Sequence, residues 1–556
     1  MIIMKKIALA ASFACVAGSV VAQVVLPPSA DPGALQQRRL EEERRRLELE
    51  RLERQPIADP IRQEPPPPAA APSAAAAVRF MVREIRFAPT SEIFSAQELQ
   101  ALAQPLTGKE VDLTDLQALA EKINATYRER GVVTARAVIP AQDVTEGIFT
   151  IRLVEGRLGK VTVSGNASTR ESYVLGRVKA EPERIVDLPA LQSSLMQFNR
   201  VNDAQLRADL KPGQSFGLTD LEISVAEPPK HVFRAGLDNH GSEVTGENRL
   251  GLSYTNNSVL GWRDTFTLGL MTASGLKSVS VDYGIPVNQM GGRLNLTVNR
   301  DSTSIKYGPF ASLDITGTST ATSLSLRQPV HFGARSQTSL LGALRQRDVQ
   351  NDIADIFLSG TKTDDVQLGV EHQQAGDASQ WVASYSLFSG RAASAGERTS
   401  FSVGRGSFRH TYFWEGGWAL RSTVSFQHSS SDELPSGDYL FLGGEGSVRG
   451  YPVGAFSGDQ GVLASAELHH PITGARGNAD DFSASGFFFV DTGRVEQVLP
   501  SDSILDKSKT LTSVGWGANL SMGRHLSAKV ALAYAVNKLP DEDKRVSVRF
   551  QLSSQF

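Results

Sequence analysis

The sequence predicts a mainly β protein: a sixteen-stranded transmembrane antiparallel β-barrel preceded by an N-terminal helix, a Pro/Ala-rich linker and two small α/β domains. Segments of about ten residues with alternating apolar and polar side chains recur from residue 231 to Phe556, as in tilted membrane strands. After an N-terminal signal, no stretch approaches the roughly 20 apolar residues of a transmembrane helix. Because lipid offers no partners to free backbone groups, the chain would cross a membrane as a closed barrel.

The last segment shows the alternation most clearly. Its apolar positions are Val546, Val548, Phe550, Leu552 and Phe556, and Ser547, Arg549, Gln551, Ser553 and Gln555 lie between them. Successive strand side chains point to opposite faces, so one face is apolar and the other polar. A soluble β-sandwich or propeller is the alternative, but the blade repeat of a propeller is absent.

The N-terminus has the pattern of a secretory signal peptide over residues 1–22. Lys5 and Lys6 precede an apolar run, and small residues lead to a predicted cleavage site between Ala22 and Gln23. A lipoprotein would instead be acylated at Cys15, whose preceding residues match that pattern poorly. Cys15 is the only cysteine, so the mature chain is expected to have neither disulfides nor thiolate chemistry.

A charged helix is expected within residues 23–55. Residues 34–55 hold seven Arg and six Glu, spaced so that many opposite charges lie one helical turn apart. The helix is polar nearly all round and has no face for lipid. The sequence alone favours a solvated spacer, and a plug in a water-filled lumen is the alternative. The Pro/Ala-rich residues 56–77 then form a linker.

Two α/β domains are expected at 78–156 and 157–228. In the first, a helix over residues 113–130 carries Leu116, Leu119 and Ile123 at helical spacing, which gives one apolar face for a small sheet. The second has a helix near residues 188–199 between strands. The barrel is expected to occupy 231–556.

Two motifs stand in the barrel region. Gly443 to Tyr451 reads Gly-Gly-Glu-Gly-Ser-Val-Arg-Gly-Tyr, and Phe487 to Arg494 reads Phe-Phe-Phe-Val-Asp-Thr-Gly-Arg. With them, nearly the whole chain resembles the two-partner secretion transporter family (TpsB, of the haemolysin/haemagglutinin secretion/activation type). That family belongs to the superfamily in which polypeptide-transport-associated (POTRA) domains precede an outer-membrane barrel. The resemblance implies two POTRA domains and an inward-folded loop at 443–458.

The two motifs also have a physical interpretation of their own. Strand alternation places Phe489 and Asp491 on one face, and a carboxylate facing lipid is costly, so this face is expected to line the lumen. The planar guanidinium of Arg449 on a glycine-rich loop can fold inward and meet that carboxylate. By resemblance, the pairing motif comprises Val448, Arg449, Gly450, Tyr451, Phe489, Asp491 and Gly493.

The resemblance implies an outer-membrane transporter with POTRA domains in the periplasm. These domains would bind a large unfolded exoprotein through its N-terminal secretion domain and pass it to the barrel. Strand addition is the expected mode, at a sheet edge near 161–164 or 205–210. A terminal strand with Phe550, Leu552 and Phe556 resembles the signal read by the barrel-assembly machinery, and the barrel's surroundings would be outer-membrane lipid.

Other functions have weaker support. An outer-membrane assembly factor shares the superfamily motifs, and a passive porin would leave the two periplasmic domains without a purpose. No nucleotide-binding loop is present, and a net charge of -3 does not favour nucleic acid. The nine histidines show no metal-ligand spacing. We therefore predict no catalytic residues, no metal and no cofactor.

Overall fold

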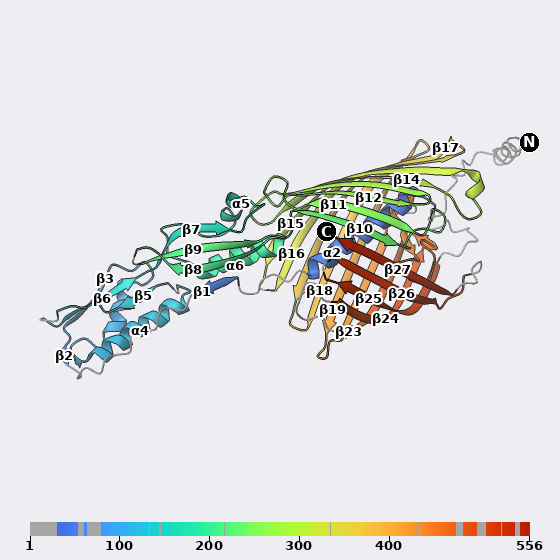
Figure 1. The fold of residues 1–556 in the computed structure, drawn as a ribbon. Helices are drawn as coiled ribbons and strands as arrows, with labels where there is room; N and C mark the ends of the chain where they lie inside the picture. Colours follow the sequence, from blue (N-terminus) through green and yellow to red (C-terminus); the bar gives the residue numbers. More distant parts are fainter. Residues whose placement is uncertain are drawn as a thin grey trace, which may run out of the picture.

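Figure 1 shows two small α/β domains that extend from one end of a β-barrel. The computed structural model describes residues 30–53, 60–63, 79–473, 482–497, 508–539 and 545–556, except 133, 144–145, 216, 334, 432–433 and 524. The expected signal peptide and its cleavage site at Ala22 and Gln23 lie outside the described residues.

The first α/β domain packs two helices against a small sheet. Its elements are β2 (Phe80–Met81), β3 (Glu84–Ala88), α3 (Ala96–Ala103), β4 (Glu110–Val111), α4 (Leu113–Glu129), β5 (Arg136–Val138) and β6 (Ile148–Val154). The sheet order is β3-β6-β5. Leu116, Leu119, Ile123 and Tyr127 lie on one face of α4 and are buried against the sheet, as their helical spacing predicts.

The second α/β domain lies between the first and the barrel. It contains β7 (Arg157–Ser164), α5 (Glu171–Leu175), α6 (Leu188–Val201), β8 (Gln205–Pro212) and β9 (Leu218–Ala226). Its core is formed by apolar residues of α6, β8 and β9, including Leu195, Leu206 and Ile223. The sequence did not predict the short helix α5, which is shorter than two helical turns and carries little periodic signal.

The linker contributes an unexpected strand to this second sheet. Residues Ile61–Gln63 form β1, which pairs in parallel with Ala208–Leu210 of β8. Ala208 N–H donates to the carbonyl of Pro60 at 2.8 Å, and Ile61 packs against the domain core. A three-residue strand beside proline is too short to show an alternating pattern, so the linker boundary placed at 56–77 missed it.

Sixteen antiparallel strands form a closed barrel in which each strand pairs with its neighbour in sequence. They are β10 (His231–Asp238), β11 (Arg249–Asn256), β12 (Thr265–Ala273), β13 (Leu276–Pro286), β14 (Arg293–Ser304), β15 (Ile315–Phe332), β16 (Ser336–Ile353), β17 (Ile356–Ala375), β18 (Ser379–Ser394), β19 (Glu397–Phe413), β20 (Ala419–Ser429), β23 (Gln460–Thr473), β24 (Phe482–Glu496), β25 (Ser508–Met522), β26 (Leu526–Ala535) and β27 (Val546–Gln555). Pairing of β10 with β27 closes the ring. The predicted fold class is confirmed.

The two faces of the barrel wall differ as the alternation predicts. On β27, Val546, Val548 and Leu552 are among the exposed large apolar side chains, whereas Arg549 is buried. Exposed apolar residues recur at alternate positions on other strands, such as Leu250 and Leu252 on β11. A continuous apolar belt of this kind faces lipid in a membrane barrel.

Helix α2 (Pro32–Glu53) runs through the barrel (Figure 1). Its N-terminal half contacts β14, β15 and β16. The solvated spacer favoured by the sequence is therefore wrong for this structure, and the plug alternative describes it. A helix without an apolar stripe suits a lumen whose wall is charged. In the described part of the chain, no helix combines the length and apolar character needed to cross a membrane.

Candidate functional site: a loop and a helix inside the barrel

The segment 434–459 between β20 and β23, here called the inward loop, folds into the barrel. It contains η2 (Ser436–Asp438) and a hairpin of β21 (Leu440–Leu442) and β22 (Phe456–Gly458). The sequence placed the start of the inward loop at residue 443. In the structure Leu434 is already buried against the wall, so the inward part begins earlier. The glycine-rich motif marks only the tip of this loop.

Arg449 and Asp491 form the pair that we call the lock. Arg449 Nε lies 2.7 Å from Asp491 Oδ2, and Nη2 lies 2.7 Å from Oδ1. Both side chains are almost fully buried. Arg449 Nη1 also contacts Glu467 at 2.5 Å, and its guanidinium lies 3.6 Å from the centre of the Phe489 ring. This bidentate, charge-assisted contact is the strongest kind of side-chain pair.

The other motif residues fit the loop tip to the wall. Val448 is fully buried, and the Tyr451 hydroxyl accepts a 2.9 Å hydrogen bond from the amide of Asn537. Gly450 has a φ of 105°, which only glycine adopts without strain. At Gly493, a Cβ would lie 2.6 Å from the Leu442 side chain. Glycine on the wall therefore makes room for the loop.

Polar contacts hold the plug helix α2 to the wall. Arg39 Nη2 lies 2.8 Å from Asp301 Oδ1 of β14. Gln36 Nε2 donates to the carbonyl of Ser319 at 3.0 Å, and Ser319 Oγ donates to Gln36 Oε1 at 2.7 Å. One turn further on, Glu42 lies 3.2 Å from Arg249. Two of the charges that made this helix look solvated, Arg39 and Glu42, thus have partners on the lumen wall.

The plug also contacts the tip of the inward loop. Arg38 Nη2 donates to the carbonyl of Gly443 at 3.3 Å, and Arg45 Nη1 donates to that of Gly446 at 2.6 Å. These two contacts join the elements that fill the lumen. A movement of either one therefore changes the surroundings of the other.

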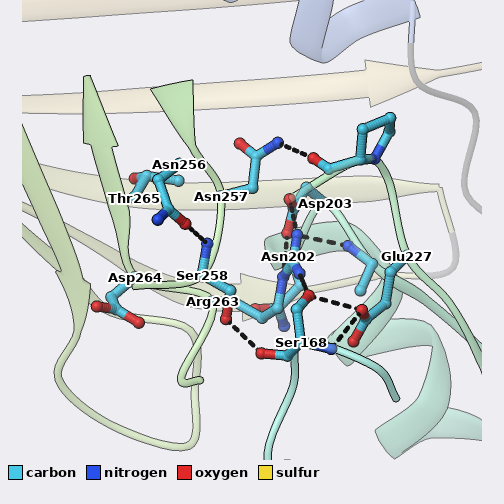
Figure 2. A network of polar contacts seen from close by, with 12 residues as sticks. Ser168, Asn202, Asp203, Glu227, Asn256, Asn257, Ser258, Arg263, Asp264 and Thr265 are labelled. Atoms are coloured by element: carbon cyan, nitrogen blue, oxygen red, sulfur yellow. Dashed lines mark hydrogen bonds and ion pairs between the residues drawn. The ribbon is translucent and has the colours of Figure 1, made fainter. Parts of the chain in front are cut away.

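A buried polar joint fixes the second α/β domain to the barrel. Figure 2 shows Arg263, in the turn between β11 and β12, beside Asp203 and Ser168. Arg263 is fully buried, and its Nε lies 2.8 Å from Asp203 Oδ1. Burial raises the pKa of Glu227, but hydrogen bonds from Ser168 outweigh it and hold that pKa below its ordinary value. The sequence did not predict this joint, because no motif links a turn arginine to an aspartate of another domain.

The strand edges expected to receive a partner differ in availability. On β8, the range 205–210 is partly covered by β1. On β7, residues 161–164 pair with β9, and the backbone contacts on the outer edge of this strand are made by Arg157 and Leu158 at its start. In the first domain, Asn124 Oδ1 accepts from Ala137 N–H of the edge strand β5 at 2.7 Å. This contact caps the amide that an added strand would need.

The three residues expected to form an insertion signal lie on the lipid-facing side of β27. Leu552 and Phe556 are exposed, and Phe550 is partly exposed. The backbone of Phe556 exchanges hydrogen bonds of 2.9 and 3.0 Å with that of Phe233. The terminal residue therefore takes part in closing the barrel. Within the described ranges, His, Cys, Asp and Glu form no cluster of three or more that could hold a metal.

Comparisons with known proteins agree with this geometry. The family described as haemolysin secretion/activation protein ShlB/FhaC/HecB matches residues 217–521, and a ShlB-type POTRA domain matches residues 80–156. Heme/hemopexin transporter protein HuxB of Haemophilus influenzae (strain 86-028NP) is 23% identical over 474 residues, 80% of this chain and 82% of its own. Outer membrane transporter CdiB of Dickeya dadantii is 24% identical, over 70% of this chain and 72% of its own.

Solved structures show the same fold. CdiB from Escherichia coli superposes with a TM-score of 0.66 at 21% identity, over 97% of this chain and 100% of that one. BamA from Haemophilus ducreyi without its POTRA domains 1–3 superposes with a TM-score of 0.52 at 16% identity, over 86% of this chain and 100% of that one. The chain therefore belongs to the haemolysin secretion/activation family and is the outer-membrane transporter of a two-partner secretion system, with its POTRA domains in the periplasm.

Proposed function

We propose that the barrel conducts a large unfolded exoprotein from the periplasm to the cell surface, and that the plug and the inward loop close this passage at rest. One observation carries the proposal: both elements are attached to the wall by side-chain contacts such as Arg39 with Asp301 and the lock. The wall itself is closed by continuous backbone pairing. The side-chain contacts of the plug and the inward loop can be replaced by contacts with water one at a time. The backbone hydrogen bonds between two barrel strands would have to break together, so the plug and the loop are the parts that can move.

Strand addition to the POTRA sheets is the recognition mode that the edges support. The β8 edge offers backbone groups to an extended segment, and β1 already uses part of it in this structure. We propose that the linker and the exoprotein compete for β8. An exoprotein segment that displaces β1 from β8 would release the linker that follows the plug.

Ile61→Asp should increase the apparent affinity of the exoprotein's secretion domain for the transporter. The substitution removes an apolar contact that holds β1 on the second domain, worth about 1.5 kcal/mol, so the edge becomes free about tenfold more often. Binding of the isolated secretion domain to the purified full-length variant measures this. Ile61→Val keeps the contact and is the matched control. Weaker binding by Ile61→Asp would contradict the competition.

An assembly factor that inserts other barrel proteins is the alternative, since BamA shares the fold. Lateral insertion would need the β10–β27 seam to open, whereas secretion through the lumen would not. In the structure this seam is paired from Arg234 with Gln555 to Asp238 with Gln551. The closed seam favours secretion, and a passive porin does not explain a plugged lumen.

A disulfide across the seam should leave secretion unchanged. Gly236 and Ser553 are direct partners, and a Cβ at Gly236 would meet only the Leu552 carbonyl oxygen, at 3.6 Å. The Gly236→Cys/Ser553→Cys pair adds the only cysteines of the mature chain. Secretion of the exoprotein is measured with and without reductant, beside each single variant and a strain without the transporter. Loss of secretion that reductant restores would show lateral opening and favour the assembly factor.

The remaining partners follow from the barrel itself. We propose that the exposed apolar belt contacts outer-membrane lipid and that Phe556, with Phe550 and Leu552, is read by the barrel-assembly machinery before the seam closes. The family is one of transporters, and we propose no enzymatic step. Energy for export would come from folding of the exoprotein outside the cell.

A further inference from the structure

A carboxylate near the start of the inward loop is held by three arginines of the barrel wall. Asp438, in η2, is 1% exposed. Its carboxylate oxygens lie 3.1 Å from Arg405, 3.5 Å from Arg347 and 3.8 Å from Arg345. Arg345 and Arg347 belong to β16 and Arg405 to β19. We call these three residues the arginine clamp.

Further contacts make the clamp rigid. Gln427 Nε2 and Arg405 Nη2 donate to the backbone carbonyl of Asp438 at 2.8 and 3.0 Å. The Phe388 ring lies 4.4 Å from the guanidinium of Arg345 and 4.9 Å from that of Arg405. Stacking on an aromatic ring restricts a guanidinium to one orientation. The cations are therefore held in place for Asp438.

The clamp and the lock use different parts of the wall. The clamp lies on β16 and β19, with Gln427 of β20, whereas the lock lies on β23 and β24. Between Asp438 and Arg449, the loop contains Gly443, Gly444 and Gly446, with φ of 95°, 88° and 85°. Glycines of this kind allow a segment to pivot. The loop thus has two anchors with a glycine-rich stretch between them.

The clamp is also connected to the first turns of the plug. Arg347 Nη2 donates to Gln37 Oε1 at 3.4 Å, and Ser436 Oγ donates to Asp31 Oδ1 at 3.1 Å. Asp31 in turn accepts from the amide of Ala34 at 2.7 Å at the start of α2. One end of the plug therefore rests on the same short helix that carries Asp438.

We propose that Asp438 is a second, independent anchor of the inward loop. It fixes the base of the loop to the wall and seats the first turns of the plug, while the tip that carries Arg449 moves about the glycine-rich stretch. Withdrawal of Asp438 would remove a carboxylate from all three cations of the clamp; among the ion pairs of the described residues, Arg345 alone would keep another, with Asp365 at 2.7 Å, while Arg347 and Arg405 would keep the neutral partners Gln37 and Gln427. Buried cations without a counter-ion are strongly unfavourable, so the base stays when the tip leaves. The inference rests on the gate roles proposed above.

Single reporter cysteines in the full-length protein test this proposal, because the mature chain has none of its own. Pro435→Cys reports on the loop base and Ser447→Cys on the tip, through the rate of reaction with a small maleimide. Asp438→Asn, which removes the charge at nearly constant shape, should raise the rate at position 435 on the order of tenfold, as expected for loss of charge-assisted hydrogen bonds. It should also increase the open fraction of single channels in planar bilayers. Asp491→Asn should raise the rate at position 447 alone.

The controls separate this anchor from general loosening and from failure of transport. Asp348→Asn removes an exposed carboxylate of β16 that pairs with Lys362 and should change neither rate. If Asp438→Asn does not yield a heat-modifiable barrel, Arg405→Gln takes its place. The proposal is overturned if Asp438→Asn, or Arg405→Gln in its place, leaves the maleimide reaction rate at position 435 unchanged. It is also overturned if Asp491→Asn raises the reaction rates at positions 435 and 447 equally. The labelling and conductance measurements need no exoprotein, so they test the anchor alone. Failure of the proposed secretion function would appear in a separate assay, as exoprotein secretion that these variants leave unchanged.

Discussion

Arg449→Ala should nearly abolish secretion while the barrel still inserts into the outer membrane. Without the guanidinium, Asp491 is left as a buried carboxylate on the wall, and truncation of one partner of such a pair costs about 3–5 kcal/mol. The loop tip then loses its defined resting position, because the Phe489 contact is lost with it. The barrel strands pair through their backbones, so insertion does not depend on this side chain.

Three comparisons make this result specific. Arg449→Lys keeps the charge but loses the bidentate geometry, and secretion should be only partly restored. Arg494→Ala removes an exposed arginine of the same strand as Asp491 and is the matched control. In a double-mutant cycle, Asp491→Ala should add little to Arg449→Ala. The measurements are the amount of exoprotein in the medium and the amount of heat-modifiable barrel in the membrane. Normal secretion by Arg449→Ala would contradict the proposed role of the lock.

The barrel and the lock were accessible from the sequence because each has a local signature. Alternation from Val546 to Phe556 fixes which face of a strand is apolar, and this signal needs no knowledge of the neighbours. Arg449 and Asp491 lie in two recognisable motifs, so their pairing followed from resemblance together with the cost of a carboxylate in lipid.

The missed features are contacts between residues whose partners lie far away in sequence. Asp438 stands in a loop of ordinary composition, and only the fold brings the arginine clamp around it. Arg263 and Asp203 meet because a barrel turn enters the second POTRA domain. The plug was the alternative that the sequence favoured less, for a different reason: a helix that is charged all round has the same pattern whether it lies in bulk water or in a charged lumen, so the sequence cannot distinguish the two.

Removal of residues 23–55 should give the largest change in ion conductance. A helix with its side chains is about 10–12 Å across, and a sixteen-stranded barrel has a lumen wide enough to conduct water and ions once it is emptied. Purified protein in planar bilayers should therefore change from mostly closed to persistently open channels. No rise in conductance would show that the plug does not block the conducting path.

Single substitutions that weaken the attachment of the plug should open the channel less than removal of the plug does. Arg39→Ala and Asp301→Asn each break the ion pair between the plug and β14, and together they should add little to either alone. Each should shift the closed-to-open ratio by a factor of about ten, since a hydrogen bond to a charged group is worth about 1.5–3 kcal/mol. Arg46→Ala, at an exposed position of the same helix, serves as the control.

A covalent attachment of the plug tests whether it must leave during export. A Cβ at Gly33 would lie 2.9 Å from the Val349 side chain of β16, so Gly33→Cys and Val349→Cys are close enough for a disulfide. The oxidised variant should block secretion, and reductant should restore it, because cargo and helix cannot share one lumen. Secretion that continues with the plug attached would mean that cargo passes beside the helix. Together with the seam disulfide, which should have no effect, this variant identifies the lumen, rather than the lipid-facing side of the barrel, as the route.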